Sequence, residues 1–431
     1  MKARAWIGLA LLCGAPAAAQ QTTSITLEAP PWAAHLERVS RPAAPVMGLA
    51  VALPHGSEVD PADRPGVARL AADAVVAEVE GRMGPGEIEG QASVEPDHTV
   101  LTFLVRPDRA EATLRALDEI GFGAGPSTAT VSAVRSRRAE VLRFELDSPL
   151  QEVGIERRAL LYGVGDPRTH PPRGTLTVVE SIQDSEVDAA RRALFVRGEA
   201  RIVAVGPLGP PSEPVPLAGR VDPVDESADS VGVLAAPPTQ PTPPGGTTSA
   251  GPAWTTPDRR VVVREVTNSW ISVAFPVPAD LPRIAVLFVA DRMQQELDAT
   301  PPDPGLFNVS VEVVEMPEGE VLVVEAAVLP DASDRFERKI LELPPRIAAE
   351  RDPAFFRYHR GRFRARQLVA DAPPEAAARR MAAELLTRGR ILAFDEAVWS
   401  LDVSMATRAA AALGSPRVLV FGPDFSGGGT P

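Results

Sequence analysis

The chain has 431 residues, of which 45% are hydrophobic and 23% are charged, and its formal net charge is −13 at pH 7. This length gives room for two or three domains, and the proportions are those of a globular protein, which excludes wholesale disorder. The acidic balance argues against nucleic acid and anionic membranes as partners.

Residues 1–19 have the pattern of a secretory signal peptide. Lys2 and Arg4 give a positive start, residues 5–13 form a short apolar run, and small residues lead up to Ala19. The apolar run is too short to cross a bilayer, so no membrane span is expected. We therefore expect cleavage near Ala19 and export to the periplasm or the exterior.

A lipid anchor on Cys13 is the alternative for this segment. Leu12 precedes that cysteine, and it is larger than the residue usually found there, which favours the cleaved form. Cleavage would remove the only cysteine, leaving no disulfide and no thiolate metal site.

Further along, the same order of strands and helices occurs twice. The first half is expected to have strands at 25–30, 46–54, 89–95, 99–106 and 201–207, and helices at 66–80, 108–120, 131–146, 150–162 and 181–195. The second half is expected to have strands at 270–278, 309–314, 321–328 and 417–423, and helices at 283–297, 352–371 and 374–386. The closing strands, RIVAVGP and RVLVFGP, are nearly identical.

This repetition predicts an internal duplication. Short turns between neighbouring strands favour an α+β class, in which each domain is a largely antiparallel sheet packed with helices. The predicted domains are residues 24–207 and 258–425. Between them, residues 208–257 are rich in proline and glycine and are expected to form an extended linker.

The stretch from Gly66 to Val76 is the most informative part of the sequence. It follows a strand and a polar turn, and it resembles the active-site helix of the insulinase/pitrilysin metallopeptidases, the inverted zincins. Their H-x-x-E-H motif supplies two zinc ligands and a general base. In this chain the three positions are Arg69, Ala72 and Asp73. Arg69 and Asp73 lie one helical turn apart and are expected to form a surface ion pair.

The resemblance covers roughly residues 25–206 and 259–424. It is supported by Gly56-Ser57, by Ala92-Ser93-Val94 and by the segment 170–174. It implies two homologous domains that face each other as a clamshell around a chamber.

The remaining catalytic groups implied by the resemblance are incomplete. The third zinc ligand would be Glu140 or Glu145, although a solvated helix charge is the favoured interpretation of both. A second-half arginine and tyrosine that bind substrate would fall on Asp298 or Pro301 and on Asn308. We therefore expect no catalytic residues, no metal site and no cofactor, whereas active relatives use zinc.

The basic run at 357–366 is another candidate surface. Its spacing favours Phe355, Phe356 and Phe363 packing inward with solvated arginines, and an acidic partner surface is the alternative. None of the five histidines is paired at helical ligand spacing.

The functional expectation is an exported, non-catalytic metallopeptidase-like protein. It would be a partner subunit of an active zinc peptidase of the same family, or a chamber that holds peptides. A homodimer is the other assembly considered. Two alternatives stay open: a stand-alone envelope protein that binds peptides, and a weak zinc endopeptidase with a rearranged site.

Overall fold

The computed structural model describes residues 25–145, 148–209, 258–298, 304–316 and 319–424. The predicted signal peptide, the linker residues 210–257 and Pro301 lie outside these residues.

The first half consists of one mixed sheet and six helices. Its strands are β1 (Ala33–Ser40), β2 (Met47–Leu53), β3 (Ile88–Val94), β4 (Thr99–Val105) and β5 (Ala200–Gly206). Its helices are α1 (Val67–Met83), α2 (Ala110–Glu119), α3 (Thr128–Glu145), α4 (Leu150–Tyr162), α5 (Leu176–Ser181) and α6 (Asp184–Leu194). The sheet order is β1-β5-β2-β4-β3; β1 and β5 are parallel and the other neighbours are antiparallel.

The second half repeats this plan element by element. Its strands are β6 (Asp258–Val263), β7 (Ser269–Val277), β8 (Leu306–Met316), β9 (Gly319–Val328) and β10 (Arg417–Gly422). Its helices are α7 (Arg283–Leu297), α8 (Ser333–Ala348), α9 (Pro353–Ala370), α10 (Pro374–Arg388), α11 (Phe394–Ser400) and α12 (Val403–Ala412). The order β6-β10-β7-β9-β8 matches that of the first sheet, again with a parallel outer pair. The predicted duplicated α+β architecture is confirmed.

Alternation along β2 shows why its whole length is buried. Leu49, Val51 and Leu53 belong to the core beneath α1, whereas Ala50 and Ala52 belong to a second cluster on the opposite face of the sheet. Because successive side chains point to opposite faces, a strand covered on both sides reads as a continuous apolar run.

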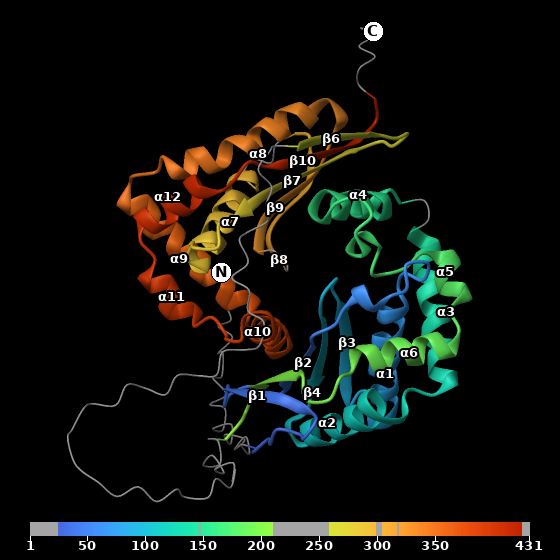
Figure 1. The fold of residues 1–431 in the computed structure, drawn as a ribbon. Helices are drawn as coiled ribbons and strands as arrows, with labels where there is room; N and C mark the ends of the chain where they lie inside the picture. Colours follow the sequence, from blue (N-terminus) through green and yellow to red (C-terminus); the bar gives the residue numbers. More distant parts are fainter. Residues whose placement is uncertain (1–24, 146–147, 210–257, 299–303, 317–318, 425–431) are drawn as a thin grey trace, which may run out of the picture.

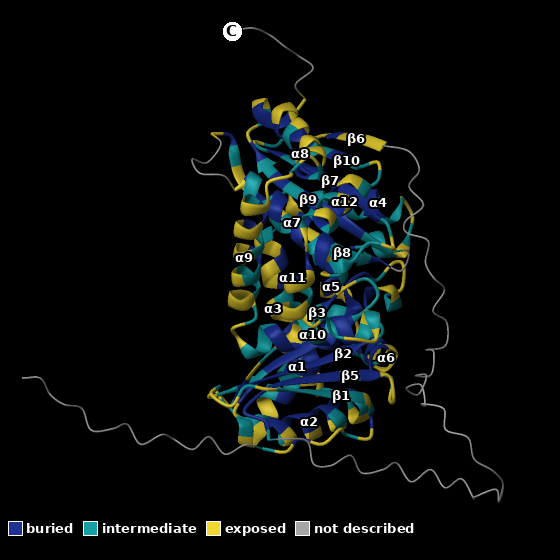
Figure 2. Cartoon of the chain, turned by 90° about the vertical axis from the view of Figure 1, so that its left-hand side faces the viewer, coloured by how far each residue is buried: buried dark blue, intermediate teal, exposed yellow. Residues whose placement is uncertain are grey.

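Each sheet has its own helices on one face, and a helix from the other half packs on its opposite face. In Figure 1, α10 lies against the first sheet and α4 lies against the second. The first contact joins α10 to β2, β4 and β5, and its buried members are Ala50, Ala52, Val100, Val203, Val205, Ala377, Ala378, Ala382 and Leu385. The second contact joins α4 to β6, β7, β9 and β10, and includes Leu160, Leu161, Val262, Ala274, Val321, Val323, Leu419 and Phe421. Figure 2 shows the resulting pattern: the inner strands β2 and β5 are buried, the edge strand β6 is largely exposed, and helices such as α9 have exposed outer faces.

Two local predictions were wrong, and several elements were missed. No strand forms over 25–30, where Ile25 makes only an isolated bridge to Leu208, and the edge strand is β1 instead. The helix expected over 181–195 is two helices, because Gln183 and Glu186 form a reciprocal capping box that starts α6. The elements β6, α8, α11 and α12 were not predicted. No helix among the described residues is long and apolar enough to cross a membrane.

Candidate functional site

The start of α1 is fixed by a half-buried carboxylate and a glycine. Asp60 accepts hydrogen bonds from the backbone amides of Gly66 and Ala68, both at 2.6 Å, which satisfies donors that a helix N-terminus leaves unpaired. Burial raises the pKa of Asp60 to about 6, against the effect of these two amides. Gly66 has a φ of 95°, and a side chain there would meet the backbone of Gly174. The polar turn thus sets the position of the helix that carries the candidate site.

Arg69 and Asp73 occupy the two motif positions that would hold zinc, and they bind each other. Arg69 Nε donates to both Asp73 carboxylate oxygens, at 2.9 and 3.0 Å. Their side chains are only 24% and 20% exposed, so the pair is half-buried instead of lying on the surface as expected. Arg138 of α3 approaches Asp73 to 3.8 Å. Burial raises the pKa of Asp73, which the two arginines oppose.

The third motif position and the two relic candidates do not complete a metal site. Ala72 is fully buried and contributes no donor atom. Glu140 is exposed on α3, whereas Glu145 lies 3.2 Å from Arg173 and lines a cavity together with Arg69. Among the described residues, no group of three or more His, Cys, Asp or Glu side chains is arranged to hold a metal. A guanidinium at a ligand position also repels a dication, so this donor set does not fit zinc.

The second-half positions are separated from each other. Asp298 is exposed at the end of α7, where its carboxylate accepts a hydrogen bond from Gln294 at 2.6 Å. Asn308 is exposed beside the bulge in β8 and lines a different cavity of about 520 Å³. Neither position carries the cation or the phenol that the resemblance implies.

Two neighbouring cavities lie along α4, one lined by residues of the first half alone and the other by residues of both halves. The first, of about 510 Å³, includes Arg69 and Glu145 in its lining, and the second includes Asn308 and Trp270. This region is not among the sites predicted from the sequence. The available signal was the pair Arg157-Arg158 within an otherwise amphipathic helix.

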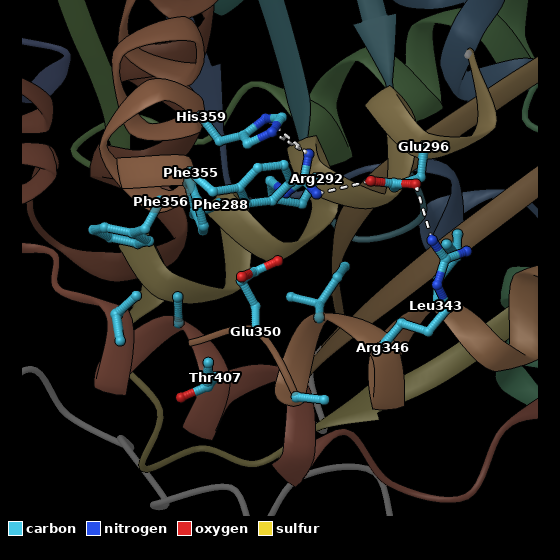
Figure 3. Close-up of a pocket in the computed structure, with 14 residues that line it drawn as sticks. Phe288, Arg292, Glu296, Leu343, Arg346, Glu350, Phe355, Phe356, His359 and Thr407 are labelled. Carbon is cyan, nitrogen blue, oxygen red and sulfur yellow. Dashed lines mark hydrogen bonds and ion pairs between the residues drawn. The ribbon is translucent and has the colours of Figure 1, made fainter. Parts of the chain in front are cut away.

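A separate cavity of about 290 Å³ lies among α7, α8, α9 and α12. Figure 3 shows Arg292 between His359 and Glu296. Arg292 lies 2.8 Å from His359 Nδ1 and donates to Glu296 at 2.8 Å, and its guanidinium is 4.9 Å from the centre of the Phe355 ring. Burial and the adjacent Arg292 lower the pKa of His359 to about 4. The cation at the base of this cavity is therefore already partnered by the protein.

The aromatic residues of α9 lie largely as predicted. Phe356 and Phe363 are buried and pack against Phe288 of α7 at centroid distances of 5.3 and 5.7 Å. Phe355 is half-buried over Arg292, and Arg357 and Arg362 are exposed. Inward packing thus accounts for two of the three phenylalanines.

No family model and no curated protein sequence matches the chain. Among solved structures, a protease from Helicobacter pylori is 15% identical with a TM-score of 0.65, over 90% of this chain and 96% of that one. The periplasmic protease PqqL from Escherichia coli is 13% identical with a TM-score of 0.63, over 90% of this chain but 44% of that one. A peptidase M16 inactive domain from Pseudomonas fluorescens is 13% identical with a TM-score of 0.63, over 90% and 95%. The chain therefore has the two-half fold of the insulinase/pitrilysin-type (M16) peptidases.

Proposed function

We propose that this chain is an exported, non-catalytic member of the insulinase/pitrilysin family that holds a polypeptide between its halves without cutting it. The observation that carries the proposal is the Arg69–Asp73 ion pair at 2.9 Å, which occupies both helix positions where zinc ligands would be needed. The buried Ala72 in place of the general base supports the same conclusion.

The cavities along α4 support the holding role. Two spaces of about 510 and 520 Å³ lie along α4, and residues of both halves line the second. Ligand sites are commonly concave spaces of this kind. Export rests on the pattern of residues 1–19, and the similarity to a periplasmic protease supports it.

Metal analysis and a peptidase assay test the non-catalytic part. After exhaustive dialysis we expect far less than one zinc per chain, and no chelator-sensitive cleavage of an unfolded protein substrate. One tightly held zinc per chain, or cleavage abolished by a chelator, would contradict the proposal.

Partnership with an active peptidase is the finer proposal. The likeness to a separate inactive M16 domain supports it. Affinity purification from the native envelope, followed by mass spectrometry, is expected to recover a chain that carries an intact H-x-x-E-H motif. Recovery of this chain alone as a monomer would favour the stand-alone peptide-binding alternative, and a self-association would favour the homodimer.

A further inference from the structure

The first cavity along α4 concentrates positive charge in an acidic protein. Its lining includes Arg69, Arg157, Arg158 and Arg173, against two carboxylates, Glu95 and Glu145. The chain as a whole has a net charge of −13. A cluster of positive side chains attracts anions locally, even on a protein whose net charge is negative.

Three of these arginines have carboxylate partners in the structure. Arg69 binds Asp73, Arg173 lies 3.2 Å from Glu145, and Arg157 forms an ion pair with Glu325 of β9. Each of these pairs is at least partly exposed to the cavity or to solvent.

Arg158 differs from its neighbours because it has no ion pair within the described part of the chain. Its Nε donates to the carbonyl oxygen of Thr169 at 3.2 Å. Burial and the adjacent Arg157 together lower the pKa of Arg158 to about 10. The guanidinium is nevertheless protonated at neutral pH. A half-buried cation that forms no ion pair among the described residues is costly to keep, and Glu95 in the same cavity offsets only part of that cost. An anionic ligand would remove that cost.

The second cavity extends this site into a trough. The two cavities share the lining residues Ser148, Leu150, Gly154 and Arg157. The guanidinium of Arg158 lies at this junction, 3.6 Å from where a Cβ on Gly154 would be. Beyond it the lining is mainly neutral and includes Thr267, Asn268, Trp270, Ser272, Asn308 and Ser310. The trough is cationic at one end and polar or apolar at the other, and it is far larger than a single small anion requires.

We propose that this trough binds acidic polypeptide segments, with side-chain carboxylates at Arg158 and Arg173 and the rest of the segment running past Gly154 into the second cavity. This inference rests on the proposed peptide-holding function. It names the class of peptide that the chamber selects.

Fluorescence anisotropy with two rhodamine-labelled peptides tests the inference. One peptide is rich in Glu, and the other has Gln at each of those positions. We expect the Glu peptide to bind about tenfold more tightly or better, and the difference to shrink as salt is raised. Arg158→Gln should remove most of the preference, because a charge-assisted hydrogen bond to a carboxylate is lost.

Two control variants separate this effect from a general loss of charge or of fold. Arg115→Gln makes the same charge change at an exposed site on α2, paired with Glu111, and should leave the preference intact. Arg158→Lys keeps the charge and should retain part of it. A thermal melt of each variant shows whether the fold is preserved.

Equal affinity for the two peptides would overturn the inference and leave the peptide-holding function standing. Binding of inorganic phosphate as tight as that of the Glu peptide would also overturn it, because the site would then serve a small anion. Loss of preference in Arg115→Gln to the same extent as in Arg158→Gln would show a diffuse charge effect in place of a site. Cleavage of either peptide would contradict the proposed function itself.

Discussion

At the scale of single residues, two glycines meet where the candidate helix begins. Gly66 and Gly174 both have positive φ values, of 95° and 76°. A Cβ on Gly66 would lie 2.6 Å from Gly174 Cα, closer than packed atoms allow. This contact joins the turn before α1 to the loop that follows α4.

We predict that Gly66→Ala destabilises the protein by about 3 kcal/mol or more, because left-handed strain and a backbone collision add. Gly389→Ala is the matched control. Gly389 also has left-handed geometry, with φ 69° and ψ 1°, but nothing lies within 4 Å of a Cβ there. Its change should cost only about 1 kcal/mol. Thermal unfolding followed by circular dichroism measures both, and equal losses would show that the Gly174 contact is unimportant.

A second residue-scale prediction concerns His359 and pH. Its pKa is about 4 in the folded protein against the usual 6.5. The folded state therefore binds fewer protons than the unfolded state between these values, and His359 contributes stability that is present above pH 6.5 and lost as the pH falls toward 4.

Unfolding in denaturant at pH 7 and pH 5 checks this effect. The stability lost between the two pH values should be smaller in His359→Gln than in the unchanged protein. His55→Gln, at a side chain that is 39% exposed, should behave like the unchanged protein. An identical pH dependence in all three would refute the role given to His359.

At the scale of elements, the sequence predicted most regular segments but not how they cover one another. The periodicity of 283–297 matches α7 at both ends. The apolar run 46–54 could be read as a strand, but nothing in it shows that its second face meets a helix more than three hundred residues away. The candidate site could likewise be predicted from the sequence only in part. The loss of the motif at Arg69 and Asp73 was readable, whereas the convergence of Arg157 and Arg158 with them required the fold.

Each half packs one helix on the sheet of the other half, α4 on the second sheet and α10 on the first, and we call this arrangement the helix exchange. Its tightest backbone contact, between β2 and α10, gives an element-scale prediction. A Cβ on Gly48 would lie 2.3 Å from the carbonyl group of Pro374, the first residue of α10. Gly48→Ala should therefore push α10 off the first sheet, lower the melting temperature and make Arg380 and Arg388, which are half-buried in the folded protein, more accessible to trypsin. Gly81→Ala, at an open position inside α1, should instead stabilise by about 0.5–1 kcal/mol. Unchanged trypsin sensitivity in Gly48→Ala would mean that the helix accommodates the methyl group.

At the scale of the whole molecule, the halves are connected by apolar packing in addition to the chain between them. Leu160 and Leu161 are buried against the second sheet, while Ala378 and Leu385 are buried against the first. Ion pairs such as Arg157 with Glu325 add to this interface.

Limited proteolysis should show this directly. From its proline and glycine content, the segment 210–257 is predicted to be cut first. The two resulting fragments should stay together on a sizing column, even at high salt, because apolar burial is insensitive to screening. Separation of the fragments in native buffer would contradict the conclusion that the packing of α4 and α10 on the opposite sheets holds the halves together. First cuts within 60–120 or 280–340 would contradict the domain boundaries.

The reciprocal exchange of α4 and α10 also bears on how such a chain could arise. A gene that encoded one half alone would produce a sheet with an uncovered face and a helix with no sheet of its own to cover. Two copies related by a two-fold axis would correct both faults at once, since each helix would cover the other copy's sheet. The duplicated chain keeps that arrangement within one polypeptide, and the two halves are then free to diverge in sequence as long as the exchanged helices still fit.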